Sequence, residues 1–502
     1  MSALHRLRVA RYLGTFGAVM VAVAAYLGGA LPDGDLLSTP TRILATPVGP
    51  YCLAAWLVGT ALMVAAWLLA GRAGPLPARW VLVTAALWVL PLALAPPLGS
   101  RDVYAYACQG AVYLGGLNPY QVGPDALPCP WIDTMSYIWR DTPAPYGPLY
   151  LAATAGAVKI SGGHLWVVLG LLRLMAVVGV GVATTYLRRL AQACGVDDAR
   201  ATWLALAAPV TGIHLVSGGH NDALMIGFCL AGLVYAARRH PLAAGALIGL
   251  AVAVKATAGI ALPFAVLLAV RPDRSWRRLC GAAAWAALGF AVTYGAIALV
   301  TGLGVGWLAG LRYSGETVQW TSVPTGVGMA VGYVGRLFGD RHLYRGAVDA
   351  SRTAALAVLA VVLVATWWRA RGRDARQTVG YAGGALLVAT MLAPVFHPWY
   401  WLLPITVLAA AGVAARWAVA VTAALAFLVL PDGYSLARAI QAPGAFAALA
   451  AAIAAVVWWG RRYLTGRRLA PAGAAAPAHD VSGVEAGVPP TAESAPVPPV
   501  ER

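Results

Sequence analysis

Charged residues are scarce in this sequence. Only 11% of its 502 residues are Asp, Glu, Lys or Arg, whereas 60% are hydrophobic and the mean hydropathy is +0.72. In soluble domains about a quarter of the residues are charged. The apolar excess recurs along the whole chain, in runs near the length of about 20 residues that crosses a bilayer. This pattern excludes a soluble globular protein and predicts an all-α, polytopic membrane protein.

Two further absences limit which metal sites and substrates are expected. The six cysteines form no Cys-x-x-Cys pair, so a zinc site is not expected. Neither a glycine-rich phosphate loop nor a dinucleotide-binding fingerprint is present, which disfavours a nucleotide-activated substrate. We expect no cofactor; a divalent metal held by His220 and Asp222 is not expected but is not excluded.

Lysine is nearly missing. Only Lys159 and Lys255 occur among the 36 basic residues, and both lie inside short apolar runs. A cation within the membrane is a functional-site hypothesis by default, and a lipid phosphate is its natural counter-charge. The alternative is that each ammonium group extends along the apolar surface to the membrane interface.

The net charge of +17 does not indicate nucleic-acid binding, because the arginines form short runs between apolar segments. The positive-inside rule places such runs in the cytoplasm. We therefore predict a multi-pass plasma-membrane protein with a cytoplasmic N-terminus (1–11), a transmembrane domain (12–469) and a disordered cytoplasmic tail (470–502). The runs are Arg188-Arg189, Arg238-Arg239, Arg271 to Arg278, Arg369 to Arg376 and Arg461 to Arg468.

The apolar runs predict about 12–15 membrane helices, some of them half-spanning or re-entrant. The first run follows three arginines and is interpreted as a signal-anchor helix. Residues 243–270 are expected to form a hairpin that returns to the cytoplasmic side. The long runs are Tyr12–Leu31, Tyr51–Ala70, Trp80–Leu98, His164–Leu187, Ala201–Ser217, Ala223–Ala237, Arg278–Thr301, Ser351–Trp368, Val379–Pro394, Trp399–Val413, Ala418–Pro431 and Ala445–Trp459. The short runs are Leu149–Ile160, Ala243–Val254, Ala258–Val270 and Val327–Phe338.

Residues 99–148 form a long polar loop on the outer side. The loop combines aromatic rings, which stack on sugar faces, with carboxylates and amides, which bond to hydroxyl groups. Asp102 lies where the third apolar run meets this loop. It is a candidate general base, or alternatively a structural ion partner of Arg101 or a helix cap. Cys108 and Cys129 either form a disulfide in this loop or remain free thiols.

Two shorter motifs fall on the same outer side. In Ser217–Asp222 the glycines permit a tight turn, and Asn221 or Asp222 can cap the next helix, but capping does not account for His220. In Phe396–Trp401 the aromatic residues fit a membrane-interface belt, which does not account for His397. We therefore predict one outer polar site, with cations near the membrane, that collects Asp102, His220, Asn221, Asp222 and His397.

Taken together, the motifs resemble those of the actinobacterial polyprenol-phosphate-mannose-dependent α-(1→6)-mannosyltransferases of the GT-C superfamily. The resemblance covers roughly residues 12–462. It implies a GT-C transmembrane fold and inverting transfer of mannose to a lipid-linked α-(1→6)-mannan of lipomannan and lipoarabinomannan, on the extracytoplasmic face. The motifs are Arg101-Asp102-Val103-Tyr104, Asn118-Pro119-Tyr120, Trp139-Arg140, Pro145-Tyr146-Gly147-Pro148, Gly219-His220-Asn221-Asp222 and His397-Pro398-Trp399-Tyr400.

The resemblance places the catalytic carboxylate at Asp102, with Asp125, Asp133 and Asp141 as rival bases. Many GT-C relatives carry paired acidic residues at this position, whereas here Asp102 follows Arg101, which disfavours a required metal. The expected partners are the polyprenol-phosphate-mannose donor, the mannan acceptor and membrane lipids, without nucleic acid. Substrate binding is assigned to Arg101, Tyr104, Arg140, Tyr146, His220, Asn221, Asp222, Lys255, His397 and Tyr400.

Two alternatives stay open. One is a transferase that uses another polyprenol-phosphate sugar, such as arabinofuranose or glucose. The other is a flippase or transporter of lipid-linked sugars, for which paired charges at mid-membrane and an internal repeat are typical. The polar motifs gather on one face and no repeat is evident, so the transferase is favoured.

Overall fold

The computed structural model describes residues 2–32, 40–311, 313–340, 342–413 and 415–468. It has two compact units, Met1–Ala452 and Ile453–Arg502, and the candidate site lies within the first. Among the described residues the chain is helical, without a named strand; one isolated bridge joins Val429 and Ser435. The predicted all-α class is confirmed. The predicted tail, 470–502, lies outside the described residues.

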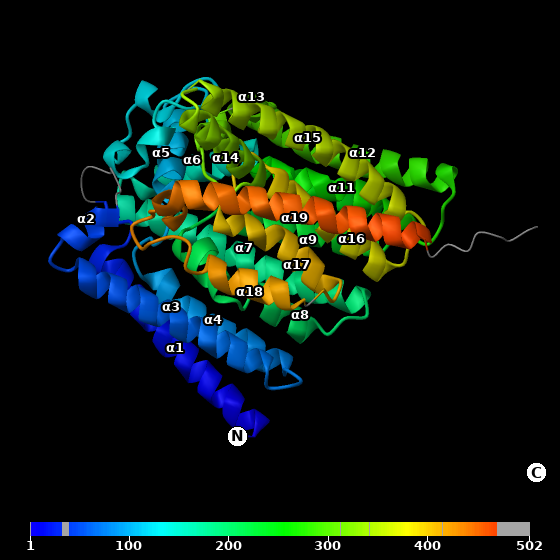
Figure 1. Cartoon of the computed structure of the whole chain (residues 1–502), viewed down its shortest axis with the longest axis horizontal. Coiled ribbons are helices and arrows are strands. Elements are labelled where there is room, and N and C mark those ends of the chain that lie inside the picture. The colour runs from blue at the N-terminus through cyan, green and yellow to red at the C-terminus, as the bar shows by residue number, and fades with distance from the viewer. Residues whose placement is uncertain (1, 33–39, 312, 341, 414, 469–502) are drawn as a thin grey trace, which may run out of the picture. The chain divides into compact units, whose positions relative to one another are not determined.

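The helices follow one another along the chain as Figure 1 shows. They are α1 (Ala3–Gly28), α2 (Pro40–Ala45), α3 (Gly49–Gly71), α4 (Ala78–Leu94), α5 (Asp102–Leu114), α6 (Pro148–Ser161), α7 (Leu165–Ala193), α8 (Asp198–Ala205), α9 (Asp222–Ala237), α10 (Pro241–Val254), α11 (Leu262–Val270), α12 (Trp276–Thr301), α13 (Trp307–Gly310), α14 (Val323–Leu337), α15 (Leu343–Ala370), α16 (Ala375–Leu392), α17 (Leu402–Ala410), α18 (Arg416–Leu425) and α19 (Gln441–Arg468). Short 3-10 helices and one π-helical segment, Thr211–Ser217, join them.

Membrane-spanning segments are fewer and more broken than the apolar runs suggest. Within the described residues, six helices are long and apolar enough to cross a membrane, or up to seven if a bent pair counts as one span. The six are α1, α3, α7, α12, α15 and Leu436–Val457. Five apolar helices are shorter, including α4, α10 and α18. The polytopic class is therefore confirmed, with several elements too short to cross on their own.

Two predicted spans were wrong in their bounds. The first helix begins at Ala3, not at Tyr12, so the predicted cytoplasmic N-terminus is largely helical. The run Ala201–Ser217 is not one helix, because α8 ends at Ala205 and the chain becomes helical again only before the π-helical segment. Pro209 explains the break, since proline lacks an N–H and disfavours helical geometry in the residue before it.

The predicted outer loop 99–148 is not a loop throughout. Its first part is α5, a 13-residue helix in which nine residues are buried, among them Tyr104 and Tyr106. The backbones of α5 and α6 approach closely: a Cβ added at Gly110 would lie 2.7 Å from the carbonyl carbon of Thr154. Because α5 is buried nearly all round, it lacks the one-sided apolar stripe by which a sequence reveals an amphipathic helix.

Cys108 and Cys129 form a disulfide, which decides between the two states that the sequence left open. The bond closes a 21-residue separation and links α5 to the segment that follows it. That segment contains the short helices Pro124–Ala126, Ile132–Thr134 and Tyr137–Trp139. The disulfide therefore holds the remaining loop against the helix that begins at Asp102.

The hairpin expected at 243–270 is present. Helix α10 leads to a break at Lys255, and a 3-10 turn (Ala256–Ala261) followed by α11 leads back. The guanidinium of Arg239 donates to the carbonyl of Arg271 at 3.0 Å, and that of Arg271 donates to the carbonyl of Ala237 at 2.8 Å. The two ends of the hairpin are thus joined, and Lys255 stands at its tip.

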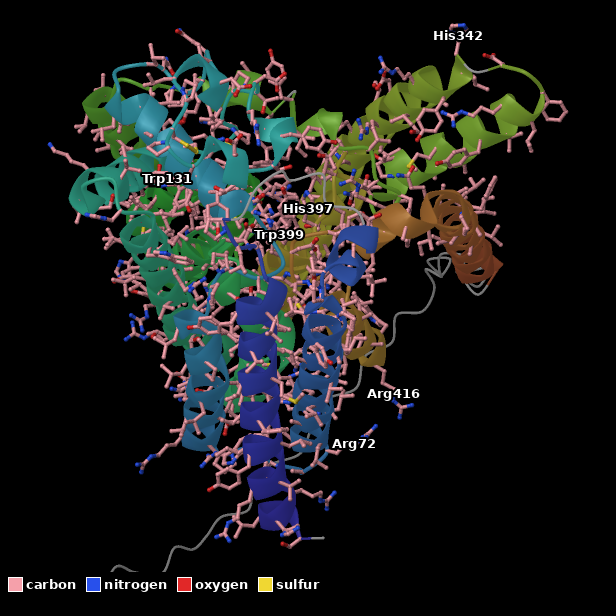
Figure 2. All side chains as sticks on the ribbon, turned by 90° about the vertical axis from the view of Figure 1, so that its left-hand side faces the viewer. Arg72, Trp131, His342, His397, Trp399 and Arg416 are labelled. Carbon is pink, nitrogen blue, oxygen red and sulfur yellow. A yellow bond between two sulfur atoms is a disulfide. The ribbon has the colours of Figure 1, made fainter. Side chains whose placement is uncertain are left out.

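A second sharp reversal faces this tip. The π-helical segment Thr211–Ser217 and α9 are bent by 109° at the intervening turn. Gly219 has a φ of +64°, which glycine adopts without strain. Figure 2 shows Arg72 and Arg416 at one end of the helices and Trp131 and His342 at the other. This separation agrees with the predicted grouping of arginines on one side.

Candidate active site

Four chain segments bring polar side chains together between the two ends of the helices. They are the start of α5, the bend before α9, the tip of the α10–α11 hairpin and the turn before Pro398. Figure 2 shows His397 and Trp399 between the arginine-bearing end and the end with Trp131. The side chains that the four segments supply are Asp102, His220, Asp222, Lys255 and His397.

Three rings form a stack at the centre of the site. The ring of His220 lies over Trp399 with centroids 3.8 Å apart, and Trp399 lies parallel to His397 at 4.6 Å. Trp399 is 5% exposed, so it is a packing element of this stack and not part of an interface belt. The indole fixes the orientation of both imidazoles by dispersion and ring electrostatics.

The contact between His220 and Asp102 requires a proton. Nδ1 of His220 lies 2.6 Å from the carbonyl oxygen of His214, so Nδ1 carries a hydrogen and donates it. Nε2 faces Oδ2 of Asp102 at 3.5 Å, a distance that is long for a hydrogen bond and short for an electrostatic contact. Two lone pairs would repel at this distance. A proton therefore belongs to the pair.

The ionisation of Asp102 follows from its surroundings. Burial raises the pKa of Asp102, but the His220 contact, with smaller effects of His397 and Lys255, outweighs burial and holds the pKa below its ordinary value. Asp102 is thus a carboxylate. Burial lowers the pKa of His397 to about 4, so His397 is neutral near pH 7 and offers both a donor and an acceptor.

Lys255 and Asp222 form a buried bidentate ion pair. The ammonium nitrogen lies 3.0 and 2.8 Å from the two carboxylate oxygens, and the side chains are 12% and 3% exposed. The same nitrogen lies 4.2 Å from the ring centroid of Tyr400. Asp222 is therefore the partner of Lys255 instead of a helix cap, and Lys255 does not extend to an interface.

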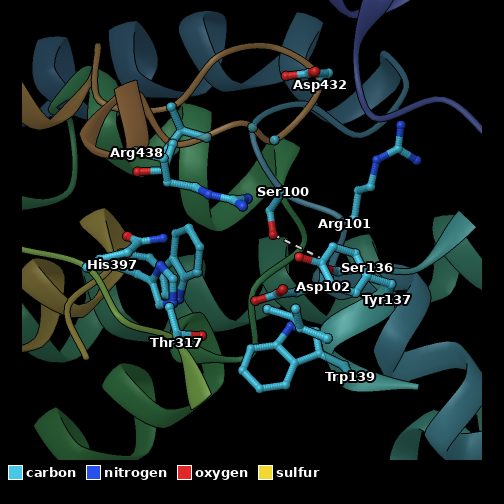
Figure 3. A pocket seen from close by; sticks show the side chains of 17 residues that line it. Ser100, Arg101, Asp102, Ser136, Tyr137, Trp139, Thr317, His397, Asp432 and Arg438 are labelled. Carbon is cyan, nitrogen blue, oxygen red and sulfur yellow. Dashed lines mark hydrogen bonds between the residues drawn. The ribbon is translucent and has the colours of Figure 1, made fainter. Parts of the chain in front are cut away.

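Two cavities meet at Asp102, and Trp139 and His397 line both of them. The larger, about 400 Å³, has mainly apolar walls and contains Lys255, Tyr146 and Tyr400. The smaller, about 190 Å³, has the larger share of polar groups in its walls, which include Ser100 and Arg438. Figure 3 shows Asp102, Trp139 and His397 around the smaller cavity. A carboxylate thus stands at the junction of an apolar and a polar chamber.

Four predicted residues do not contribute as expected. Tyr104 is fully buried and donates its hydroxyl to the carbonyl of Ala30. Arg140 pairs with Asp133 at 3.2 Å, and neither residue is among those that line the two cavities. Arg101 lines the smaller cavity, but its guanidinium donates to the carbonyls of Leu31 and Thr134, and Figure 3 shows it directed away from Asp102. Asn221 is buried within the bend, 2% exposed.

The rival bases are all exposed. Asp125, Asp133 and Asp141 lie on the surface of the loop and line neither cavity, whereas Asp102 lines both. Sequence reasoning missed the polar wall formed by Thr317, Gln319, Ser435 and Arg438. No signal marked these residues, because they lie in short loops beside apolar runs. Among the described residues, no cluster of three or more His, Cys, Asp or Glu side chains is placed to hold a metal.

The fold and the site together define a polytopic helical membrane protein in which an aspartate, paired with a buried histidine, lines two adjoining cavities. Residues 11–271 match the family model described as α-(1→6)-mannopyranosyltransferase, N-terminal domain, and residues 324–459 match the MptB C-terminal domain. The chain therefore belongs to the α-(1→6)-mannopyranosyltransferase family, a family of mannosyltransferases. No solved structure matches the chain.

Relatives with this name cover most of the sequence. The α-(1→6)-mannopyranosyltransferase A of Mycobacterium tuberculosis is 34% identical over 437 residues, 84% of each chain. The protein of the same name from Corynebacterium glutamicum is 31% identical over 418 residues, 78% of this chain and 83% of the relative. The α-(1→6)-mannopyranosyltransferase B of that organism is 29% identical over 476 residues, 85% and 77%.

The Lys255–Asp222 pair predicts a non-additive effect on stability. Lys255→Met leaves a buried carboxylate unpaired and is expected to destabilise the protein by about 3–5 kcal/mol. The double variant Lys255→Met/Asp222→Asn should regain most of this loss, because neither charge remains. Thermal unfolding in detergent measures both. Lys159→Met, which changes the other, exposed lysine, is the matched control. Equal effects of the two lysine substitutions would contradict a buried ion pair.

The His220–Asp102 contact predicts a change in pH dependence. His220→Gln removes the largest influence that opposes burial and leaves only the smaller effects of His397 and Lys255, with Tyr106 and Tyr146 as the other titratable neighbours. The pKa of Asp102 should rise, so the acid limb of the activity profile should move from below about pH 4 to higher pH. His164→Gln, at an exposed histidine that precedes α7, is the control. A uniform loss of activity at every pH, with an unmoved acid limb, would indicate a structural role alone.

Proposed function

We propose that this protein transfers mannose from polyprenol-phosphate-mannose to a lipid-linked α-(1→6)-mannan, by inverting displacement with Asp102 as general base. The observation that carries this proposal is the position of Asp102 at the junction of the two cavities. An inverting displacement needs the nucleophile and the leaving group on opposite sides of the reacting carbon. Two chambers that meet at one carboxylate supply this arrangement.

The apolar cavity suits the donor. Its walls include Leu311 and Leu356, and Leu356 lies on the membrane-span candidate α15 with half of its side chain exposed. A polyprenyl chain can therefore enter from the lipid side while its phosphate reaches Lys255. An ammonium group has three donors, and Asp222 occupies two hydrogen-bonding directions of Lys255 in this structure. The charge of Lys255 is thus held in place within reach of an anionic headgroup.

The reaction balances with these groups alone. The acceptor hydroxyl gives its proton to the Asp102 carboxylate as its oxygen bonds to the anomeric carbon of mannose. The bond between that carbon and the phosphate oxygen breaks, and polyprenol phosphate departs with the electron pair. Lys255 stabilises the additional negative charge on the phosphate. A β-linked donor gives an α-linked product, because one displacement inverts the configuration.

No divalent metal is part of this proposal. A phosphate is already a good leaving group, and Lys255 supplies positive charge to the cavity in which we place it. We expect EDTA to leave the transfer rate unchanged under conditions in which the donor stays soluble. A complete loss of transfer that Mg²⁺ or Mn²⁺ restores would contradict the metal-free mechanism.

We further propose that the acceptor is the growing mannan core of lipomannan and lipoarabinomannan, elongated on the extracytoplasmic face of the plasma membrane. The support is the opposite placement of arginine-bearing turns, represented by Arg72 and Arg416, and the loop with Trp131. The disulfide between Cys108 and Cys129 agrees with this orientation, because disulfides persist outside the reducing cytosol.

Transfer by purified protein tests the proposal. Wild type in detergent should transfer radiolabelled mannose from polyprenol-phosphate-mannose to a short α-(1→6)-mannoside. Asp102→Asn should lower kcat by about 100- to 10,000-fold, the usual range for a general base. Asp133→Asn, at a rival but exposed carboxylate, should retain full activity. Near-normal turnover by Asp102→Asn would eliminate Asp102 as the base.

The same assay separates the alternatives. Transfer from a polyprenol-phosphate arabinofuranose or glucose in place of mannose would keep the mechanism and change the donor. Movement of the donor across a vesicle membrane without transfer would identify a flippase instead. The described site disfavours a flippase, because its charged groups converge on one carboxylate where two cavities meet.

A further inference from the structure

The polar cavity is built from segments that come together only in the tertiary structure. One wall is the start of α5 with Ser100, a second is the segment 317–320, and a third is the turn 429–438. The indole of Trp320 donates to the carbonyl of Ala437 at 2.8 Å, which joins the second and third walls. The hydroxyl of Thr321 donates to the carbonyl of Phe396, next to His397. The chamber is therefore tied together around Asp102.

The turn 429–438 is fixed close to the base. Its ends are held by the bridge between Val429 and Ser435, and the amide of Gly99 donates to the carbonyl of Pro431 at 2.9 Å. Gly433 has a φ of +99°, and a Cβ there would lie 3.5 Å from Cα of Ser100. This turn thus stands against the residues that immediately precede Asp102.

One buried hydroxyl in this chamber has no hydrogen-bond partner among the described residues. The Oγ1 atom of Thr317 is inaccessible to solvent and bonds to none of them, although Thr317 lines the cavity. A buried hydroxyl without a partner is costly, so such a group marks a place where a ligand can form a hydrogen bond. Gln319, Ser435 and Arg438 add an amide, a second hydroxyl and a guanidinium, and Figure 3 shows Arg438 extending toward Ser100.

We propose that this chamber is the acceptor subsite, where Thr317, Gln319 and Arg438 bind the terminal mannosyl residue and direct its 6-hydroxyl to Asp102. The inference rests on the proposed function and deepens it. Donors and acceptors at several points match the hydroxyl groups of a hexose, and Trp139 offers a ring face on which the pyranose can stack.

The size of the chamber limits what it recognises. Its volume of about 190 Å³ lies below the 300–1,000 Å³ that is usual for drug-sized ligands. It therefore holds one sugar ring, and the rest of the mannan extends outside. The enzyme accordingly recognises the end of the acceptor and not its length.

Substitution of Thr317 tests the subsite. Thr317→Val keeps the shape of the side chain and removes only the unpartnered hydroxyl, so the unfolding temperature should not fall. The KM for a short α-(1→6)-mannoside should rise about 3- to 10-fold, the effect of one lost hydrogen bond. The KM for polyprenol-phosphate-mannose should not change. Arg438→Met should act in the same direction, and Thr185→Val, the same change on the exposed part of α7, is the control.

Each possible result of these measurements either supports or overturns the acceptor subsite. A selective rise in acceptor KM supports the subsite. Unchanged acceptor KM, or an equal rise in donor KM, overturns it while leaving the transferase proposal intact. If wild type transfers no sugar, the affinity of the same α-(1→6)-mannoside for wild type and for Thr317→Val, measured by calorimetry, still tests the subsite. Binding of the acceptor does not need the donor. Equal affinity of the two proteins, or no binding to either, would overturn the subsite.

Discussion

The buried ion pair between Lys255 and Asp222 is the interaction on which the rest of the site depends. It joins the tip of the α10–α11 hairpin to the first turn of α9. Both elements reverse direction at this point, and each reversal places a charge in an apolar interior, where an unpaired charge is costly. The pair satisfies both charges. It also fixes the bend that carries His220, and through His220 the carboxylate of Asp102.

The position of this ion pair also determines how the site is divided into two chambers. Nδ1 of His220 donates to the carbonyl of His214, and the imidazole ring stacks on Trp399. These two contacts orient the ring so that its other nitrogen, Nε2, faces Asp102. Asp102 is thereby kept ionised at the border of two chambers of opposite polarity. The apolar chamber contains the cation and reaches α15, and the polar chamber contains the hydrogen-bonding side chains. The apolar chamber with its cation fits the lipid-linked donor that we propose, and the polar chamber fits a sugar hydroxyl.

The sequence predicted some of these elements and not others. The scarcity of charge revealed a polytopic helical membrane protein, and the rarity of lysine singled out Lys255. The bend with His220 and the hairpin at 243–270 were correctly located by glycines and by the length of the apolar runs. Helix α5 was missed, because it is buried all round and shows no polar face. Tyr104 and Arg140 were assigned to substrate, but the structure uses one in packing and the other in a surface ion pair.

The sequence by itself determined the class of the molecule and the chemical groups available to it, since composition and periodicity are properties of the chain. It could not determine which charges meet. The sequence predicted that Lys255 binds a phosphate. Only the tertiary structure shows that it pairs with Asp222, 33 residues away. Asp102 had a neighbour of opposite charge in Arg101, yet its ion partner is His220, from the turn before α9. The polar chamber is likewise invisible in the sequence. The physical reason is that a buried charge is stabilised by whichever group the packing brings within about 3–4 Å, and packing, not sequence separation, sets that distance.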